Sequence, residues 1–220
     1  MAGIRQLKNI ALSLIQERDH AKLMELANEN FSLTRALISY LYNPDELICW
    51  RTIEALGKVS AAIAKSDMET IRVLIRRLFW TMNDESGSIG WNSPSAIGEI
   101  LYNIPPLIDE FGRVLASFLR EEPFEKGAHW AMARILPLNN KLVYEYTNEF
   151  VKSLDDKNPA IRGYSLMILK PLNFSILGEK REILAGDTAS FLNYDFAIGD
   201  FKTITIAEIY ATYKPLTQRG

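Results

Sequence analysis

Residues 76–99 read RRLFWTMNDESGSIGWNSPSAIGE. The first part continues an amphipathic pattern that favours a helix ending near residue 82. A polar loop with two glycines follows, and Ser93 with Pro94 then opens a second helix. Two tryptophans, two arginines and three acidic side chains are gathered in this stretch. A helix, a loop and a helix are therefore the unit from which we build the fold.

The same kind of helix start occurs three times, as Asn43-Pro44, Ser93-Pro94 and Asn158-Pro159. In each we expect the first residue to be the helix N-cap, with the proline at the first helical position. A shift of 41 residues carries Trp50 onto Trp91, and a shift of 35 carries Ile100 onto Ile135. Helix pairs that recur at about 40 residues are typical of HEAT and armadillo repeats.

Apolar residues at helical spacing predict four helix pairs. The pairs cover residues 31–41 with 44–64, 68–82 with 94–104, 107–120 with 126–136, and 141–153 with 159–170. One pair cannot bury its apolar face alone, so neighbouring pairs must stack. We expect an all-α, HEAT-like superhelix in which the second helix of each pair lines the concave face.

The whole chain, residues 1–220, is predicted to form a single repeat domain. Residues 1–30 carry two short apolar patterns and form an N-terminal helical cap. Residues 31–170 hold the four pairs, and residues 171–220 form a C-terminal cap and tail.

The tail has a different composition from the helices. Aromatic and β-branched residues lie on both sides of Gly199 and Asp200, a pattern that favours a short β-hairpin. We expect any strand to lie within residues 188–204. Thr205 and Glu208 fit a capping box that would open a final helix.

The amino-acid composition narrows down the cellular compartment of the protein and the cofactors that it could bind. Apolar residues make up 48% and charged residues 24% of the chain, as in soluble globular proteins, and no apolar run approaches the ~20 residues that span a bilayer. The single cysteine, Cys49, fits a reducing compartment, and we expect a cytoplasmic protein with no membrane contact. With only two histidines, we predict no metal and no cofactor.

The stretch from Trp80 to Trp91, of the pattern WxxNDESGxIGW, with the later PxAxGE, resembles a family of uncharacterised prokaryotic HEAT-like repeat proteins. Residues 127–135 are similar to the next inner helix of that family. The resemblance extends over residues 43–213. Ser88 stands where the family pattern has a second glycine, and Asn92-Ser93 stands where it has Gly-Ala, which implies a less flexible loop. The resemblance implies the fold and no particular activity.

The candidate binding surface surrounds the loop at residues 83–91. Tryptophan and arginine are the residues most enriched among interface hot spots. The surface would consist of Arg76, Arg77, Trp80, Asn83, Asp84, Glu85, Ser86, Trp91, Glu99, Trp130 and Arg134.

Two further expectations concern the helices themselves. The repeat shifts align Lys58, Glu99 and Arg134, so we expect a row of exposed, alternating charges. Trp80 should project away from the apolar stripe of its helix. The alternative to a binding surface is that these residues only fix the loop at residues 83–91 to the repeats.

The other polar residues give little indication of a catalytic or metal-binding site. Asp84, Glu85 and Ser86 could offer oxygens to a cation, but they lack the ligand spacing of an EF-hand. His129 lies on an apolar helix face, where a hydrogen-bonded core histidine is more common than a catalytic one. Cys49 has no identifiable base nearby in the sequence pattern.

Two functions remain open from the sequence. The first is a non-enzymatic scaffold that binds a protein or peptide partner through its concave face and the loop at residues 83–91. The alternative is a nucleic-acid-acting enzyme of the HEAT-like DNA glycosylase type, in which Trp80, Trp91 and Trp130 would stack on an extruded base. The net charge of −2 disfavours the second, because it provides no overall basic field. The oligomeric state is not predicted.

Overall fold

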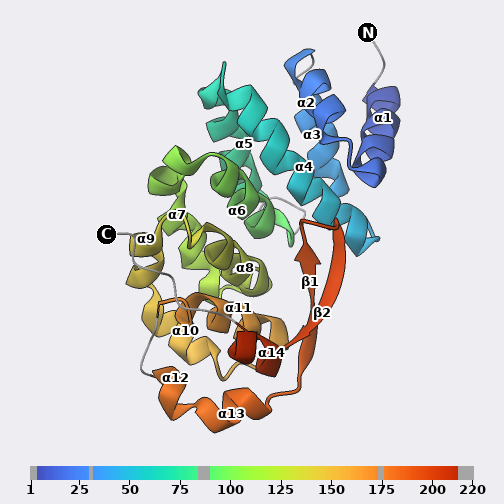
Figure 1. The fold of residues 1–220 in the computed structure, drawn as a ribbon. Coiled ribbons are helices and arrows are strands. Elements are labelled where there is room, and N and C mark those ends of the chain that lie inside the picture. Colours follow the sequence, from blue (N-terminus) through green and yellow to red (C-terminus); the bar gives the residue numbers. More distant parts are fainter. Residues whose placement is uncertain (1–3, 30–31, 84–89, 173–175, 213–220) are drawn as a thin grey trace.

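The computed structural model describes residues 4–29, 32–83, 90–172 and 176–212, which are mostly helical (Figure 1). The helices are α1 (Ile4–Glu17), α2 (His20–Glu29), α3 (Ser32–Tyr40), α4 (Glu46–Ala64), α5 (Met68–Trp80), α6 (Ser93–Asn103), α7 (Ile108–Ala116), α8 (Glu125–Ile135), α9 (Asn140–Glu145), α10 (Thr147–Ser153), α11 (Pro159–Leu169), α12 (Ile176–Glu179), α13 (Arg181–Gly186) and α14 (Ile206–Thr212). Two antiparallel strands, β1 (Ser190–Asp195) and β2 (Asp200–Thr205), form the sheet in these ranges. Across the described helices, none has both the length and the apolar character needed to cross a bilayer.

Four helices far apart in the sequence form a continuous row. Helix α4 packs against α6, α6 against α8, and α8 against α11 (Figure 1). The approach of α6 to α8 is close, because a Cβ built on Gly98 would lie 2.4 Å from the Cβ of Ala131. The helix preceding each member of the row, α3, α5, α7 or α10, packs on its partner. The predicted pairing of consecutive helices is thus confirmed.

Two of the predicted helices are interrupted. The helix expected over residues 107–120 continues after α7 as a short 3-10 segment, Ser117–Arg120. The helix expected over residues 141–153 is divided into α9 and α10 at Tyr146. At both sites a hydroxyl competes with the regular helix bonds: Ser117 donates to the carbonyl of Val114, and Thr147 donates to that of Tyr144.

The N-cap prediction holds at Asn158. Its side-chain oxygen accepts a hydrogen bond from the N–H of Ala160 at 3.0 Å, and Pro159 is the first residue of α11. The side chain therefore satisfies one of the N–H groups that a helix start leaves without a partner.

The N-cap prediction is wrong at Asn43. Helix α4 begins at Glu46, and Asp45 is its N-cap, accepting from the N–H of Leu47 at 2.9 Å. Asn43 instead accepts from the N–H of Asp45 and closes a turn before the helix.

The prediction is also wrong at Ser93, which is the first residue of α6 and lies one position inside the helix. Its hydroxyl lies 2.8 Å from that of Thr81, at the end of α5, and so joins the two helices. The N-cap is Asn92, which makes no side-chain capping bond, and its amide nitrogen donates to the carbonyl of Leu41 at 2.7 Å.

Asn158→Ala should lower the free energy of unfolding by about 1 kcal/mol, since it removes a capping bond from α11. Asn43→Ala is the matched control, because this asparagine closes a turn outside the helix and should cost less. Urea unfolding followed by far-UV circular dichroism measures both. Equal losses for the two variants would contradict the assignment of Asn158 as the cap.

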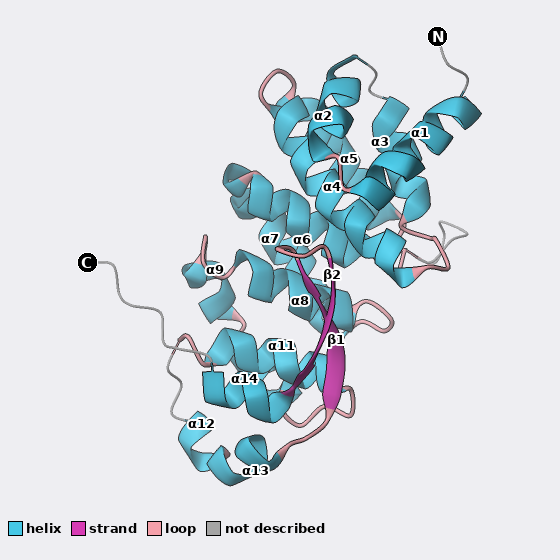
Figure 2. Cartoon of the chain, turned by 45° about the vertical axis from the view of Figure 1, so that its right-hand side comes forward, coloured by secondary structure: helices cyan, strands magenta, loops and turns pink. Residues whose placement is uncertain are grey.

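The C-terminal hairpin is present where the sequence favours one. Ser190 pairs with Thr205 and Asp195 with Asp200, so β2 ends one residue beyond the expected limit of 204. The capping box is confirmed: the N–H of Thr205 donates to Glu208, and the N–H of Glu208 donates to the hydroxyl of Thr205. Figure 2 shows the hairpin extending as an arm from the region of α11 and α14 toward the N-terminal helices.

Candidate functional site

The hairpin lies across the helix row and covers part of it with aromatic side chains. Phe191 packs on Tyr164 of α11, with ring centroids 5.2 Å apart. Further along, Phe196 stacks on Trp130 of α8 at 6.2 Å. Tyr194 stacks in turn on Trp50 of α4 at 5.7 Å. This face of the row, which we expected to receive a partner, is therefore occupied by the protein's own hairpin.

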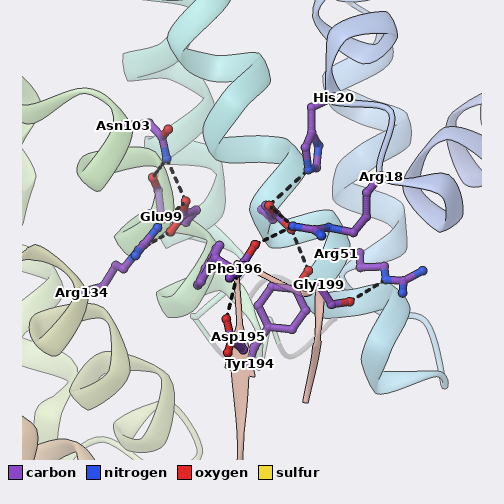
Figure 3. Close-up of polar contacts among 12 residues, drawn as sticks. Arg18, His20, Arg51, Glu99, Asn103, Arg134, Tyr194, Asp195, Phe196 and Gly199 are labelled. Atoms are coloured by element: carbon purple, nitrogen blue, oxygen red, sulfur yellow. Dashed lines mark hydrogen bonds and ion pairs between the residues drawn. The ribbon is translucent and has the colours of Figure 1, made fainter. Parts of the chain in front are cut away.

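A buried ion pair lies beneath the hairpin, between α6 and α8. Glu99 is 0% exposed, and the Nε of Arg134 donates to its carboxylate at 2.7 Å (Figure 3). The amide of Asn103 donates to the same carboxylate at 2.8 Å. The expected approach of Glu99 to Arg134 is confirmed, but Glu99 is buried and Arg134 is 23% exposed, where an exposed row was predicted. Lys58, the third member of that row, is exposed, and its charge favours ionised Glu99.

Arg134 is enclosed by aromatic rings. Its guanidinium carbon lies 3.6 Å from the ring centroid of Tyr102 and 4.0 Å from that of Phe196, at the tip of the hairpin. Cation–π contacts strengthen when water is excluded. Burial raises the pKa of Glu99, although the contacts with Arg134 act in the opposite direction. The ion pair thus depends on the hairpin above it.

A second buried carboxylate, Glu54 of α4, joins the N-terminal helices to the hairpin. Arg18 donates to it through two nitrogens, at 2.8 and 3.2 Å, and the hydroxyl of Tyr194 donates at 2.7 Å (Figure 3). The Nε2 of His20 lies 3.2 Å from the same carboxylate. Burial alone would raise the pKa of Glu54, but the contacts with these three partners lower it to about 2.

The hairpin tip is held by two arginines through backbone carbonyls. Arg18 donates to the carbonyl of Phe196 at 2.6 Å, and Arg51 donates to that of Gly199 at 3.0 Å (Figure 3). Gly199 has a φ of +68°, in the left-handed region. A Cβ at this position would lie 2.2 Å from the side chain of Arg18. Glycine is required here both for the turn and for the close approach of Arg18.

Gly199→Ala should lower the free energy of unfolding by about 1 to 2 kcal/mol, because it combines a left-handed alanine with a collision at Arg18. Gly186→Ala is the control, since a Cβ at Gly186 meets no atom within 4 Å. Thermal unfolding followed by tryptophan fluorescence tests both. Wild-type stability in Gly199→Ala would show that the tip does not depend on this contact.

The predicted surface is divided by the structure into three parts. Arg76, Arg77, Trp80 and Asn83 are exposed at the end of α5. Glu99 and Trp130 are buried beneath the hairpin, and Arg134 lies beside Glu99 with 23% of its side chain exposed. Trp91 is 63% exposed and lies at the rim of the cavity described next. Asp84, Glu85 and Ser86 lie outside the described residues.

A large cavity opens at the N-terminal ends of α4, α6 and α8. It encloses about 820 Å³. We call it the tryptophan cavity, and its lining includes Cys49, Trp50, Trp91, Trp130 and Tyr164, with Glu46 and Lys126. The sequence patterns single out these tryptophans and the cysteine one by one, and none of the patterns places them in one cavity.

His129 is a buried residue with two hydrogen bonds. Its Nδ1 lies 2.7 Å from the carbonyl of Glu125, and its Nε2 lies 2.9 Å from the hydroxyl of Ser153. Burial lowers the pKa of His129 and favours the neutral ring. The expectation of a hydrogen-bonded core histidine is confirmed.

Cys49 is likewise a buried structural residue. Its thiol lies 3.1 Å from the carbonyl of Asn43, and burial raises its pKa. A thiol in this environment remains protonated and is a poor nucleophile.

Glu54, Arg18 and Tyr194 were not predicted from the sequence to belong to a site. The sequence did contain one signal for Glu54. It lies one helical turn before Lys58, a member of the predicted charged row, so the two side chains lie on the same face of α4. No local signal identified Arg18, which follows α1 with a φ of +55°.

Comparison with known proteins leaves the family open. No family model matches the chain. No solved structure matches it either. A segment of 90 residues, 41% of this chain, is 37% identical to an uncharacterized protein from Archaeoglobus fulgidus. That match spans 46% of the archaeal protein, so it shows that the two proteins are related over part of their lengths.

Proposed function

We propose that this chain is a HEAT-like repeat scaffold that binds an acidic segment of a protein partner on the outer face of α5. The successive stacking of α4, α6, α8 and α11, each with a preceding partner helix, supports the repeat architecture. The hairpin covers part of the opposite, inner face. This proposal therefore moves the docking surface from the concave face to the outside of α5.

The observation that carries the proposal is an exposed stripe on α5, which we call the α5 stripe. It consists of Val73, Arg76, Arg77 and Trp80. Val73 and Trp80 are each 54% exposed, whereas the opposite side of α5 is buried through Ile71, Leu74, Ile75 and Leu78. Residues three, four and seven positions apart lie on one face of a helix, so the four side chains form one surface.

The positive charge of the α5 stripe indicates which kind of partner segment it would bind. Arg77 makes no ion pair among the residues that the structure describes. Arg76 pairs with Glu69 at 2.9 Å, but both side chains are more than half exposed, so the pair is weak and can be exchanged. Two arginines between two exposed apolar side chains suit a carboxylate-bearing segment with an apolar anchor.

The test is capture of a partner by the immobilised protein from native lysate, followed by quantitative mass spectrometry. The double variant Arg77→Ala/Trp80→Ala should reduce capture of a specific protein by at least about 30-fold, since hot-spot truncations cost about 2 kcal/mol or more. The matched control is Arg113→Ala/Val114→Ala, which removes an exposed arginine and an exposed apolar side chain from α7.

The control should retain the same protein, and added salt should weaken the capture, because exposed charges are screened. Both variants should remain folded, since the substituted side chains lie at the surface. Equal capture by the α5 variant and the control would overturn the proposal.

A further inference from the structure

Two helices of the row begin side by side at the mouth of the tryptophan cavity. Helices α6 and α8 have 11 residues each, and Ser95 of α6 and Gly127 of α8 both line the cavity. A Cβ built on Gly127 would lie 3.1 Å from the Cβ of Pro94 and 3.2 Å from the Oγ of Ser95. The first turns of the two helices are therefore in contact, and the lack of a side chain at Gly127 leaves the Ser95 hydroxyl uncovered on this side.

Neither of these helix starts is capped by a side chain. The N-caps, Asn92 and Phe124, make no side-chain capping bond. Among the described residues, no acceptor meets the backbone N–H of Ser95 or that of Gly127. Such N–H groups carry a partial positive charge and favour an anion. Helix α4 differs, because Asp45 caps it and compensates its N-terminus.

A buried hydroxyl without a partner lies at the same place. Ser95 is 4% exposed, and its hydroxyl makes no hydrogen bond with any described residue. Nearly all buried hydroxyls have a partner, because an unmade hydrogen bond costs free energy. The unpartnered hydroxyl of Tyr164 is fully enclosed and out of reach of a ligand, whereas that of Ser95 is not among the enclosed, unpartnered atoms of the described residues. Ser95 therefore offers the cavity a free donor.

The side-chain charges around this point suit a single negative charge. Lys126, in the first turn of α8, supplies an ammonium group, and the carboxylate of Glu46 lies 3.9 Å from it. Both side chains are about half exposed, at 46% and 56%, so this pair is weak and can be exchanged for a ligand. Glu125, in the same turn, lines a separate pocket with His129. One ammonium group and two helix starts, opposed by one carboxylate, favour a monoanion.

Exposed aromatic rings lie at the cavity mouth. Trp91 is 63% exposed and Tyr42 is 44% exposed, and both line the cavity. The amide of Asn92 donates to the carbonyl of Leu41 at 2.7 Å, which holds the chain segments that carry the two rings together. Accessible rings of this kind bury much apolar area when a flat molecule packs on them. The mouth therefore favours a ligand with an apolar ring system.

We propose that the first turns of α6 and α8 bind the carboxylate of a small organic acid that has an apolar ring system. The place, which we call the Ser95 site, consists of Ser95, Lys126 and Gly127. The hydroxyl and N–H of Ser95 and the N–H of Gly127 donate to the carboxylate, and the ammonium group of Lys126 balances its charge. The ring system packs on Trp91 and Tyr42. The Ser95 site includes no residue of the α5 stripe, so this inference goes beyond the function proposed above.

The test compares 2-naphthoate with 2-naphthamide, which share a ring system and differ in charge. Equilibrium dialysis near pH 8 and at low salt should show the wild-type protein binding 2-naphthoate at least about 10-fold more tightly, since hydrogen bonds to a charged group are stronger than those to a neutral one. Ser95→Ala should weaken the binding of 2-naphthoate by about 10-fold and that of 2-naphthamide by less. Lys126→Ala should weaken 2-naphthoate by about 2-fold to 5-fold, as expected for a partly exposed charge.

Glu46→Gln should act in the opposite direction. It removes the carboxylate that opposes the ligand and frees Lys126, so 2-naphthoate should bind about 2-fold to 5-fold more tightly. A structural role of Glu46 would not produce a gain for the acid alone.

Two matched controls locate the effect. Ser60→Ala removes another buried, unpartnered hydroxyl, which lies on α4 and does not line the cavity. Lys157→Ala removes a lysine that lies 3.8 Å from Glu122, in an ion pair as weak as that of Lys126. Neither variant should change the binding of 2-naphthoate.

The double variant Arg77→Ala/Trp80→Ala separates the Ser95 site from the α5 stripe, and it should bind 2-naphthoate as the wild type does. Loss of binding in this variant would overturn the inference, because it would place the acid on the stripe. Three other results would also overturn it: no binding of 2-naphthoate to the wild type at millimolar concentration, equal affinities for the acid and the amide, or a preference that Ser95→Ala leaves unchanged. These three results leave the α5 stripe untouched, since its test measures capture of a protein.

Discussion

Arg134→Ala should lower the free energy of unfolding by about 3 to 5 kcal/mol, the cost of leaving one member of a buried ion pair without its partner. Glu99 is fully buried and, of the donors among the described residues, keeps only the amide of Asn103 once Arg134 is removed. The substitution also removes the cation that Tyr102 and Phe196 enclose, so the hairpin tip loses a contact. Urea unfolding monitored by tryptophan fluorescence measures the loss.

Arg113→Ala is the matched control for this prediction. Arg113 forms a similar bidentate pair with Glu145, but that pair is exposed on α7 and should contribute only about 0 to 1 kcal/mol. The double variant Glu99→Met/Arg134→Met should recover much of the loss, because an apolar pair leaves no buried charge. Similar losses for the buried and the exposed arginine would contradict the packing described here.

Glu54→Gln should cost roughly 3 kcal/mol near pH 7. This value follows from the difference between the pKa of about 2 in the folded protein and the ordinary value of 4.5. The ionised carboxylate accepts from Arg18 and Tyr194, and a neutral amide of the same shape cannot replace its charge. Equilibrium unfolding of both proteins from pH 7 to pH 3 tests the prediction.

The pH dependence of this loss has a definite sign. Because the pKa of Glu54 is depressed in the folded protein, its stabilisation is complete above about pH 4.5 and is lost as the pH falls toward 2. The stability difference between wild type and Glu54→Gln should therefore shrink below pH 4.5. Glu99 has a raised pKa and acts with the opposite sign, but it is present in both proteins and cancels. A difference independent of pH would show that Glu54 is not held as a carboxylate.

Much of the helical architecture could be predicted because it is encoded locally. The apolar spacing along α5 and the proline-marked start of α11 identify a helix and its exposed side without any distant contact. For the same reason the exposure of Trp80 was predictable. The strand positions followed from β-branched residues around Gly199.

The docking of the hairpin could not be predicted in this way. Tyr194 meets Glu54 across 140 residues of sequence, and no periodicity relates the two positions. Trp130 and Arg134 were predicted as surface residues because their own helix gives no sign of the hairpin above them. The cavity was missed for a similar reason, since its walls combine residues from four helices.

The bond from Arg18 to Phe196 joins positions 178 residues apart and gives this molecule a fixed length. In a simple stack of helix pairs each pair touches only its neighbours, so a pair can be gained or lost and the ends can fray independently. Here the hairpin spans from α11 to the turn that follows α1. An inserted pair would carry Arg18 and Arg51 beyond the reach of Phe196 and Gly199. The hairpin thus fixes the number of helices between its two points of contact and couples the unfolding of the first helices to that of the last.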